Sequence, residues 1–470
     1  MIEAHLLAGY PPEVPVAAGA VATSVAKSRR TLVVLDDDPT GTQSVADLPV
    51  LTRWEVEDLR WALAQGAPAI YVLTNTRSLD PAEAEQRNRE VVRNALAAAD
   101  GAALALVSRS DSTLRGHYPL EPAVIAEVLQ EAAGIGTDGV VIVPAFPDAG
   151  RVTVGGVHYC RGDGGTLVPV AETEFARDAT FGYASSELAR YVEEKSAGRV
   201  RAEDVIVLDL NVVRGGATGI ADALLGARNS TPIVVDIVTE NDLRALALGL
   251  AEAESRGLQL LYRVGPPFVR GRIGQQVKAP LTAEEAFRGA QSSTPGGLVV
   301  VGSHVGLTTR QLSQLTEHHR CGVVELQVAR LLESGAAEEL DRVVAEVGAG
   351  LADGDVVLHT SRLLIRHDEP AESLRIARTV SAAVVEVVSR TLAAARPRFV
   401  VAKGGITSSD VAAFGLQIRH AIVRGPMLPG IVSLWEPVDG PAQGIPYVVF
   451  AGNVGDDRSL LEVVRTLSRD

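Results

Sequence analysis

The sequence predicts an α/β protein built from two α/β domains, each a mainly parallel sheet covered by helices. From Thr31 onward, short apolar runs alternate with polar turns and helical segments, and this alternation favours parallel strands. A second pattern of the same kind begins at Leu298, after a stretch rich in glycine and proline. The chain has 470 residues, of which 46% are hydrophobic, so it is too long for one ordinary core.

Changes in composition predict where the domains begin and end. Residues 1–30 mix a short apolar stretch with prolines, which is typical of an N-terminal arm, either loose or a peripheral helix. The first domain is expected over residues 31–270 and the second over residues 298–470. Residues 271–297 form the linker region, because glycines and prolines are dense from Gly265 to Gly297.

Apolar runs of four or five residues in the first domain predict strands, because they are bounded by turn residues. They are Thr31–Leu35, Ala69–Leu73, Ala103–Val107, Gly139–Val143, Val205–Leu208, Ile233–Ile237 and Leu258–Tyr262. A helix is predicted over Pro81–Ala99, with Asp80 as its N-cap and Pro81 at its first position. Another is predicted over Glu121–Ala133.

The second domain repeats this pattern. Strands are predicted at Leu298–Gly302, Val323–Leu326, Val356–His359, Gly430–Leu434 and Tyr447–Phe450, and one more runs into Lys403. Helices are predicted from about Thr308, over Ala371–Ala395, after Thr407 and at the end of the chain.

Composition also limits the class of function. The formal net charge is -14, which argues against general nucleic-acid binding but allows a local basic pocket for anionic ligands. The two cysteines, Cys160 and Cys321, are far apart and suggest neither a disulfide framework nor a zinc site. No apolar run approaches the roughly 18 residues of a membrane span, and the first residues do not resemble a signal peptide. We therefore expect a cytoplasmic protein without a membrane partner.

The segment LDDDPTGT, residues 35–42, is the most informative stretch of the chain. Asp36, Asp37 and Asp38 follow a buried strand and run into a Pro-Thr-Gly turn. In open parallel sheets this edge is where ligands bind, and three adjacent carboxylates repel one another unless a cation or a proton offsets them. A solvated acidic turn is the alternative interpretation.

Three further predicted strands also end in polar clusters, so we expect all four clusters to converge on one edge of the sheet. Such a lining suits a small, polyhydroxylated, anionic substrate, because arginine binds carboxylates and Asp or Asn accepts hydrogen bonds from hydroxyls. A surface salt bridge is the alternative role for each single arginine. The candidate substrate-binding residues are Asp36, Thr40, Asn75, Arg77, Arg109, Ser112, Arg115 and Arg151.

Glycine-rich junctions in the second domain are candidates for binding phosphate. Lys403–Ser409 places two glycines and a cation before a capped helix, an arrangement that favours anion binding. Similar junctions follow strands at Gly302–Gly306 and Gly452–Gly455. None is a Walker A loop or a GxGxxG motif, and a tight turn with an ordinary N-cap is the alternative for each.

Six segments resemble the four-carbon acid sugar kinase family in sequence and in order: LDDDPTGT, SRSDSTLRG, PAFPDAGRVTVGG, VGSH, AKGGITSSD and FAGNVG. The resemblance implies a sugar-acid-binding first domain, an ATP-binding second domain and an active-site cleft between them. It implies transfer of the ATP γ-phosphate to a hydroxyl of a threonate, erythronate or 3-oxo-tetronate type of acid. It places Ser303, Gly404, Gly405, Ile406, Thr407 and Gly452 at the ATP, and the glycine junction itself adds Lys403 as a candidate cofactor-binding residue. Ile406 and the GNVG run depart from the usual family pattern and suggest a divergent subgroup.

Phosphoryl transfer needs positioned reactants, neutralised charge and a group that accepts the hydroxyl proton. We expect Asp37 to be this base, with Asp111 as second choice, and Arg109, Arg115 and Arg151 to hold the carboxylate and the transferring phosphate. Mg²⁺ should arrive bound to ATP, so no dedicated metal site is expected. The two domains should close over the reactants, and a homodimer is one assembly that would fit.

Two other functions also fit parts of the sequence. The DxDxT-like run Asp36, Asp38 and Thr40 suggests a phosphohydrolase of the haloacid-dehalogenase type, although that chemistry needs a lysine after a later strand of the same domain. A non-catalytic sugar-acid sensor would bind the acid without transferring anything.

Overall fold

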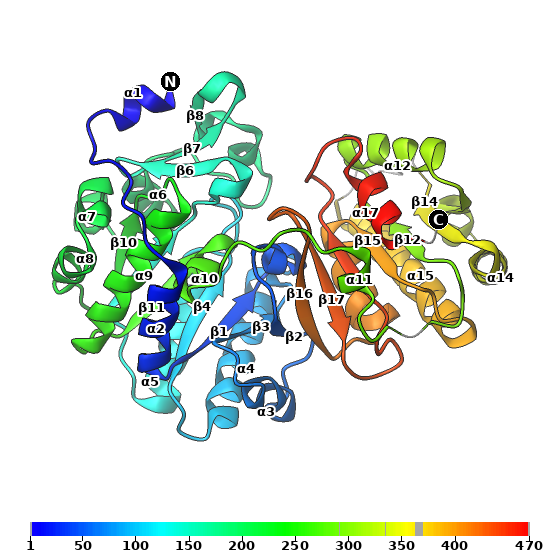
Figure 1. The fold of residues 1–470 in the computed structure, drawn as a ribbon, viewed down its shortest axis with the longest axis horizontal. Helices are drawn as coiled ribbons and strands as arrows, with labels where there is room; N and C mark the ends of the chain where they lie inside the picture. The colour runs from blue at the N-terminus through cyan, green and yellow to red at the C-terminus, as the bar shows by residue number, and fades with distance from the viewer. Residues whose placement is uncertain (1, 291, 334, 362–369, 469–470) are drawn as a thin grey trace. The chain divides into compact units, whose positions relative to one another are not determined.

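The computed structural model describes residues 2–290, 292–333, 335–361 and 370–468. The chain divides into two compact units, Met1–Val277 and Lys278–Asp470 (Figure 1). Helices and mainly parallel strands alternate in both units, which confirms the predicted α/β class.

A parallel sheet with the strand order β2-β3-β1-β4-β11-β5-β10-β9 forms the centre of the first unit. The strands are β1 (Thr31–Asp36), β2 (Leu48–Leu51), β3 (Ala69–Leu73), β4 (Leu104–Arg109), β5 (Gly139–Val143), β9 (Ile206–Leu208), β10 (Thr231–Val235) and β11 (Leu260–Val264). The predicted strands are present, with β10 and β11 displaced by two residues, whereas β2 was not predicted. Because the strands are parallel, their carboxyl ends share one edge.

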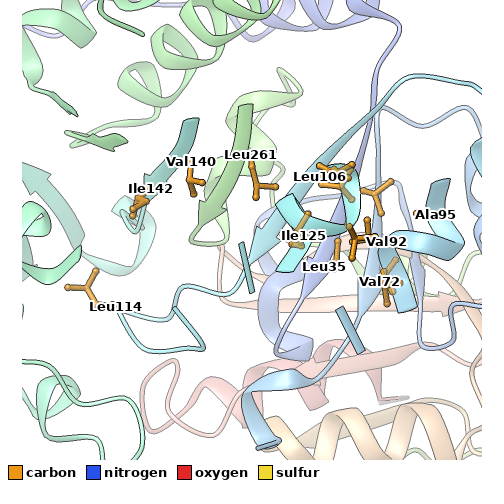
Figure 2. Packing of buried hydrophobic residues seen from close by; sticks show 14 of the residues in the cluster. Leu35, Val72, Val92, Ala95, Leu106, Leu114, Ile125, Val140, Ile142 and Leu261 are labelled. Atoms are coloured by element: carbon orange, nitrogen blue, oxygen red, sulfur yellow. The ribbon is translucent and has the colours of Figure 1, made fainter. Parts of the chain in front are cut away.

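Two groups of helices accompany this sheet (Figure 1). One group contains α3 (Val56–Ala64), α4 (Pro81–Ala99) and α5 (Leu120–Ala133), and the other contains α2 (Ala18–Ser28), α8 (Ala217–Leu224), α9 (Glu240–Ser255) and α10 (Pro267–Arg272). Figure 2 shows side chains of the first group, such as Val92 and Ile125, packed with Leu35, Val72 and Leu106 of the sheet. This burial of apolar surface holds the strand ends in place.

Helix α4 illustrates how local sequence fixes an element. The Asp80 side chain accepts a hydrogen bond from the Glu83 amide at 2.9 Å, and Pro81 occupies the first turn, where no amide donor is needed. Along the helix, Val91, Val92 and Ala95 are buried against the sheet. The predicted helix bounds are confirmed.

A small antiparallel sheet, which was not predicted, follows β5. It contains β6 (Arg151–Val154), β7 (Val157–Arg161) and β8 (Leu167–Pro169). Beyond it lie α6 (Leu188–Lys195) and α7 (Leu210–Arg214). The segment expected to be an N-terminal arm contains α1 (Glu3–Leu7) and α2, and Val21 and Val25 of α2 are buried against Ala247 of α9.

The second unit has the strand order β13-β14-β12-β15-β18-β17-β16, in which β17 and β16 are antiparallel and the others are parallel. The strands are β12 (Leu298–Val301), β13 (Cys321–Leu326), β14 (Asp355–Thr360), β15 (Val400–Lys403), β16 (His420–Leu428), β17 (Val432–Pro437) and β18 (Tyr447–Phe450). Its helices are α11 (Ala283–Ala286), α12 (Gly306–His318), α13 (Val328–Leu332), α14 (Ala336–Asp353), α15 (Pro370–Ala394), α16 (Gly405–Asp410) and α17 (Ser459–Leu467).

Strands β12, β15 and β18 are adjacent and parallel, so the three glycine junctions that follow them meet at one edge. Among the described residues, none of the helices combines the length and the apolar character that crossing a membrane requires.

Candidate functional site

Three carboxylates and two guanidinium groups form a bonded cluster at the carboxyl end of β1. Asp37 Oδ1 accepts hydrogen bonds from Arg77 Nη2 at 2.6 Å and from Arg109 Nη2 at 2.7 Å, and Asp37 Oδ2 accepts one from Arg77 Nε at 2.9 Å. Arg109 also bonds Asp36, and Arg77 Nη1 lies 3.1 Å from Asp38 Oδ2. The arginines therefore offset the repulsion between the acids.

Sheet register brings these residues together. Asp36 of β1 is the register partner of Arg109 of β4 and of Leu73 of β3. After β3, the Thr74 amide donates to the Asp36 carbonyl at 2.8 Å, and a short 3₁₀ helix, Thr76–Ser78, carries Arg77. The predicted convergence of the first three strand-end clusters is thus present in the structure.

The environments of Asp36 and Asp38 move their pKa values in opposite directions. Burial raises the pKa of Asp36 to about 7, although Arg109 opposes the change. Burial also acts to raise the pKa of Asp38, but Arg77, Arg109 and hydrogen bonds from Thr40 outweigh it, so that this pKa is lowered. Thr40 donates to Asp38 Oδ1 through its amide at 2.9 Å and through its hydroxyl at 2.5 Å. Titratable groups with separated pKa values are common at active sites.

The loop after β4 has an unusual backbone. Thr113 and Leu114 are buried and have φ angles of 55° and 65°, and Gly116 has a φ of 132°. A Cβ atom on Gly116 would lie 2.1 Å from the Ser110 carbonyl oxygen and 3.5 Å from Asp37 Oδ2. Only glycine permits this close approach to the acid cluster, and strained buried loops of this kind are frequent at functional sites.

Asp111 holds this loop in place. Its Oδ1 accepts a hydrogen bond from the Leu114 amide at 2.9 Å, and its Oδ2 is paired with Arg263. Both charged side chains are completely buried, and the Arg263 guanidinium lies 4.8 Å from the centroid of the Tyr118 ring. This geometry gives Asp111 a supporting position beneath the loop.

Arg115 and Arg151 form a second cationic group around Phe175. Their Cζ atoms lie 4.9 and 5.1 Å from the centroid of the Phe175 ring. Arg115 also bonds the Ser112 hydroxyl at 3.1 Å, while its contact with Asp178 is 3.5 Å long. Burial lowers the pKa of Arg151, and its buried Nε has no hydrogen-bond partner in the described part of the chain. These guanidinium groups are therefore less neutralised than Arg77 and Arg109.

Other predicted residues have less direct positions. Asn75 adopts a left-handed backbone with a φ of 53°, and its amide donates to the Asp36 carbonyl at 3.3 Å.

Sequence reasoning missed Glu121, Phe175 and Arg263. Glu121 is buried and bonded by Thr76 and Asn88, and burial followed by the charge of Asp37 raises its pKa. In the sequence it resembles an ordinary acid in the first turn of a helix, and Arg263 resembles an isolated charge in a strand. No motif distinguishes Phe175 from the other phenylalanines.

The second unit presents a different kind of site, made largely of backbone. The Gly302 and Ser303 amides lie 3.3 Å from the Lys403 carbonyl oxygen, and the Gly404 amide donates to the Phe450 carbonyl at 2.8 Å. Thr308 of α12 donates to the Gly452 carbonyl at 2.8 Å and contacts Ser303 Oγ at 3.2 Å. The three junctions therefore form one connected group of loops.

These loops leave no room for side chains at their glycines. A Cβ atom on Gly452 would lie 2.5 Å from Ser303 Oγ, and one on Gly302 would lie 2.2 Å from Thr407 Oγ1. Gly404 has a φ of 134°, which L-residues rarely adopt. Bare backbone next to the start of α12, a helix of 13 residues, suits phosphate groups.

Two of the predicted residues at these loops have contrasting exposure. Gly405 begins α16, and the next residue, Ile406, is 58% exposed. Lys403 is completely buried, and its Nζ donates to the Ala451 carbonyl at 2.6 Å. The Lys403 side chain is therefore buried beneath the glycine loops.

Among the described residues, no hydrogen bond or ion pair joins the acid cluster to the lysine that a haloacid-dehalogenase mechanism needs. Lys195 of the first unit donates instead to the carbonyl groups of Phe181 and Gly182.

Within the described ranges, no group of three or more His, Cys, Asp or Glu residues is arranged to hold a metal ion.

Family models match most of the chain. A model described as the sugar-binding N-terminal domain matches residues 32–272, and one described as the nucleotide-binding C-terminal domain matches residues 298–460.

Curated relatives are similar over part of their length. A D-erythronate kinase from Heliobacterium modesticaldum is 30% identical over 293 residues, which is 61% of this chain and 60% of that protein. A D-threonate kinase from Salmonella typhimurium is 31% identical over 253 residues, 54% of this chain and 53% of the relative. Another from Cupriavidus necator is 31% identical over 268 residues, 56% of each protein. The matched regions thus span little more than half of these relatives.

Solved structures share the fold. A structure described as a putative tRNA synthase from Salmonella typhimurium has a TM-score of 0.66 at 19% identity and covers 93% of this chain and 99% of its own. A Haemophilus influenzae protein has a TM-score of 0.61 at 18% identity, with 93% and 100% covered. At these identities the likeness concerns the fold alone.

Proposed function

Because this chain belongs to the four-carbon acid sugar kinase family, we propose that it transfers the γ-phosphate of ATP to a hydroxyl group of a four-carbon sugar acid. The acid is of the erythronate, threonate or 3-oxo-tetronate type. The observation that carries the proposal is the chemistry at one sheet edge of the first unit: a carboxylate cluster at Asp37 together with the guanidinium groups of Arg115 and Arg151.

The acid's carboxylate is assigned to Arg115 and Arg151. These arginines retain donor capacity, because Arg115 meets a carboxylate only through the 3.5 Å contact with Asp178 and the buried Nε of Arg151 has no hydrogen-bond partner among the described residues. Arg77 and Arg109, in contrast, are engaged by the Asp36–Asp38 run. Guanidinium groups bind carboxylates through paired, charge-assisted hydrogen bonds. The substrate hydroxyls are assigned to the acceptors around Asp37 and to Thr40, Asn75 and Ser112.

Asp37 is our candidate for the group that accepts the hydroxyl proton. The substrate oxygen forms a bond to the γ-phosphorus, the bond between that phosphorus and the β,γ-bridging oxygen breaks, and ADP leaves with the bond's electron pair. The hydroxyl proton passes to Asp37 and then to solvent. In a loose transition state little proton transfer is needed early, so a carboxylate stabilised by Arg77 and Arg109 is a sufficient base. Asp111, which is bonded by Arg263 and by the Leu114 amide, is the second candidate for this role.

The nucleotide phosphates are assigned to the glycine loops of the second unit. A Cβ atom on Gly302, Gly404 or Gly452 would collide with the side chain of Ser303 or Thr407, so these glycines allow both hydroxyl-bearing side chains to pack against the loops. Mg²⁺ would be held by the nucleotide rather than by a protein cage, and it would neutralise part of the phosphate charge. Gly405 and Ile406 begin the helix that borders this site.

The test is ADP release with a panel of D- and L-threonate, D- and L-erythronate and their 3-oxo relatives, with mass spectrometry of the product. We expect ADP and a phosphorylated acid in equal amounts for at least one acid. Phosphate release from a phosphorylated acid without nucleotide would instead indicate a phosphohydrolase. Binding of an acid without any product would indicate a sensor.

A further inference from the structure

Lys403 is an ionisable side chain that is buried beneath the glycine loops. It ends β15, and its side chain is completely buried. The Nζ atom donates to the Ala451 carbonyl at 2.6 Å and lies 3.8 Å from the centroid of the Phe450 ring. An ammonium group has three donors, and an aromatic face together with a single carbonyl neutralises its charge only in part.

No carboxylate of the described residues pairs with Lys403. The elements packed against β15 are β12, β18 and α16, whose titratable side chains are Tyr447 and Asp410. Tyr447 donates to the Ser408 carbonyl, and Asp410 accepts from Ser381. The neighbouring loops add His304, Asp456 and Asp457. Of these, His304 is placed near Thr360, Asp456 bonds Ser459 and Asp457 pairs with Arg310.

Burial alone lowers the pKa of Lys403 to about 7. At neutral pH the side chain is therefore divided between its charged and neutral forms, whereas an ordinary lysine is fully charged. A nearby anion would favour the charged form, and a low local dielectric would strengthen that effect.

The position of Lys403 places this charge next to the candidate phosphate loops. Ala451, which accepts its hydrogen bond, directly precedes Gly452. The residue after Lys403 is Gly404, whose amide donates to the Phe450 carbonyl. The ammonium therefore lies between the backbones of two of the three glycine junctions.

We propose that Lys403 is a buried countercharge for the nucleotide phosphates, and that it takes up a proton when a nucleotide binds to the glycine loops. This inference rests on the proposed nucleotide site. Lys403 acts from beneath the loops, through the field of its charge and through the Ala451 carbonyl, and is a positioning residue rather than a phosphate ligand. Its protonation also links nucleotide affinity to pH.

The linkage has a defined sign. If nucleotide binding stabilises the protonated form, affinity is highest at pH values below 7 and falls as the pH rises through the pKa of the free protein. Each unit by which the nucleotide raises that pKa corresponds to about a tenfold fall in affinity across the titration. The nucleotide's own phosphates also titrate, so a variant without the lysine charge is needed as reference.

The chain suits a direct measurement, because it contains only four lysines. In protein labelled with ¹³C at lysine Cε, the Lys403 resonance is assigned by its loss in Lys403→Met. We expect it to titrate near pH 7 in the free full-length protein and at least one pH unit higher with saturating Mg-ADP. Lys27, Lys195 and Lys278 should not move.

Calorimetry in buffers of different ionisation heat gives the second readout. Wild-type protein should take up a fraction of a proton when it binds Mg-ADP at pH 7.5, and Lys403→Met should lose this uptake and bind about tenfold more weakly at pH 6.5. The control is Lys278→Met, because Lys278 donates to the Arg424 carbonyl of the same unit, away from the loops. Mg-ADP binding with an unmoved Lys403 resonance would overturn this inference alone. Absence of Mg-ADP binding would overturn the proposed nucleotide site and this inference with it.

Discussion

The two sheet edges differ in the kind of group that forms the site. In the first unit, buried charged side chains are bonded to one another, with Asp37 held by Arg77 and Arg109. In the second, the site is backbone at Gly302, Gly404 and Gly452, supported by the buried Lys403. We propose that the first arrangement positions the carboxylate and hydroxyl groups of the acid, and that the second binds the nucleotide phosphates. We therefore expect substitutions in the first unit to change turnover or KM for the acid, and substitutions in the second unit to change affinity for the nucleotide.

The largest expected effect is at Asp37. Replacing it in Asp37→Asn removes the proposed proton acceptor and should reduce kcat by about 10²- to 10⁴-fold. The dissociation constant for Mg-ADP should stay within about twofold, because Asp37 belongs to the first unit. Asp80→Asn is the matched control, because asparagine caps a helix as well as aspartate does. Near-normal turnover by Asp37→Asn would remove it from the mechanism.

Arg151 should affect the acid more than the chemistry. We expect Arg151→Gln to raise KM for the sugar acid by about 10- to 100-fold, since a hydrogen bond to a charged group contributes about 1.5–3 kcal/mol. KM for ATP should be unchanged. Arg161→Gln is the control on the same small sheet, where Arg161 pairs with Glu3. An effect on KM for ATP alone would contradict the assignment.

In the second unit, one methyl group should be enough to disturb the site. Gly452→Ala places a Cβ atom 2.5 Å from Ser303 Oγ, so the loop must shift, and we expect affinity for Mg-ADP to fall by about tenfold. KM for the acid should not change. The control is Gly335→Ala, where no atom lies within 4 Å of the added carbon. Equal losses in the two variants would show that the effect is not specific to the loops.

The last prediction concerns the stability of the acid cluster rather than activity. Burial raises the folded-state pKa of Asp36 to about 7, so between about pH 4 and pH 7 the folded protein binds more protons at this site than the unfolded chain does. The free energy of unfolding therefore loses a contribution as pH rises through this window, by at most about 1.4 kcal/mol per pH unit. Urea denaturation at pH 5 and pH 7.5 should show a smaller loss in Asp36→Asn than in wild type. An equal loss would mean that Asp36 stays ionised when folded.

Much of the first site could be predicted from the sequence, because it depends on strand ends. Asp36 and Arg109 end apolar runs, and a parallel sheet brings such ends to one edge. The sequence could not show that Arg77 and Arg109 are engaged by the acids while Arg115 and Arg151 flank Phe175. That division depends on the position of Arg151 in β6 and of Phe175 in the 3₁₀ helix Glu174–Arg177, and short elements of this kind have weak sequence patterns.

The glycine loops show a different limit. Their place after strands was visible in the sequence, and the adjacency of β12, β15 and β18 brings them together. The orientation of Lys403 could not be inferred, because a lysine at a strand end points to solvent or to the interior according to its packing. The antiparallel strand β16 was also missed, because Gly425 and Pro426 interrupt it and read as turn residues.

Amide hydrogen exchange on the full-length chain tests the central claim most directly, namely that the acid binds to side chains of the first unit and the nucleotide to backbone of the second. We expect the most active acid of the panel to protect peptides that contain residues 36–42 and 109–117. Mg-ADP should protect peptides that contain residues 302–308, 403–410 and 451–456. Protection of the glycine loops by the acid alone, or of residues 36–42 by Mg-ADP alone, would contradict the account.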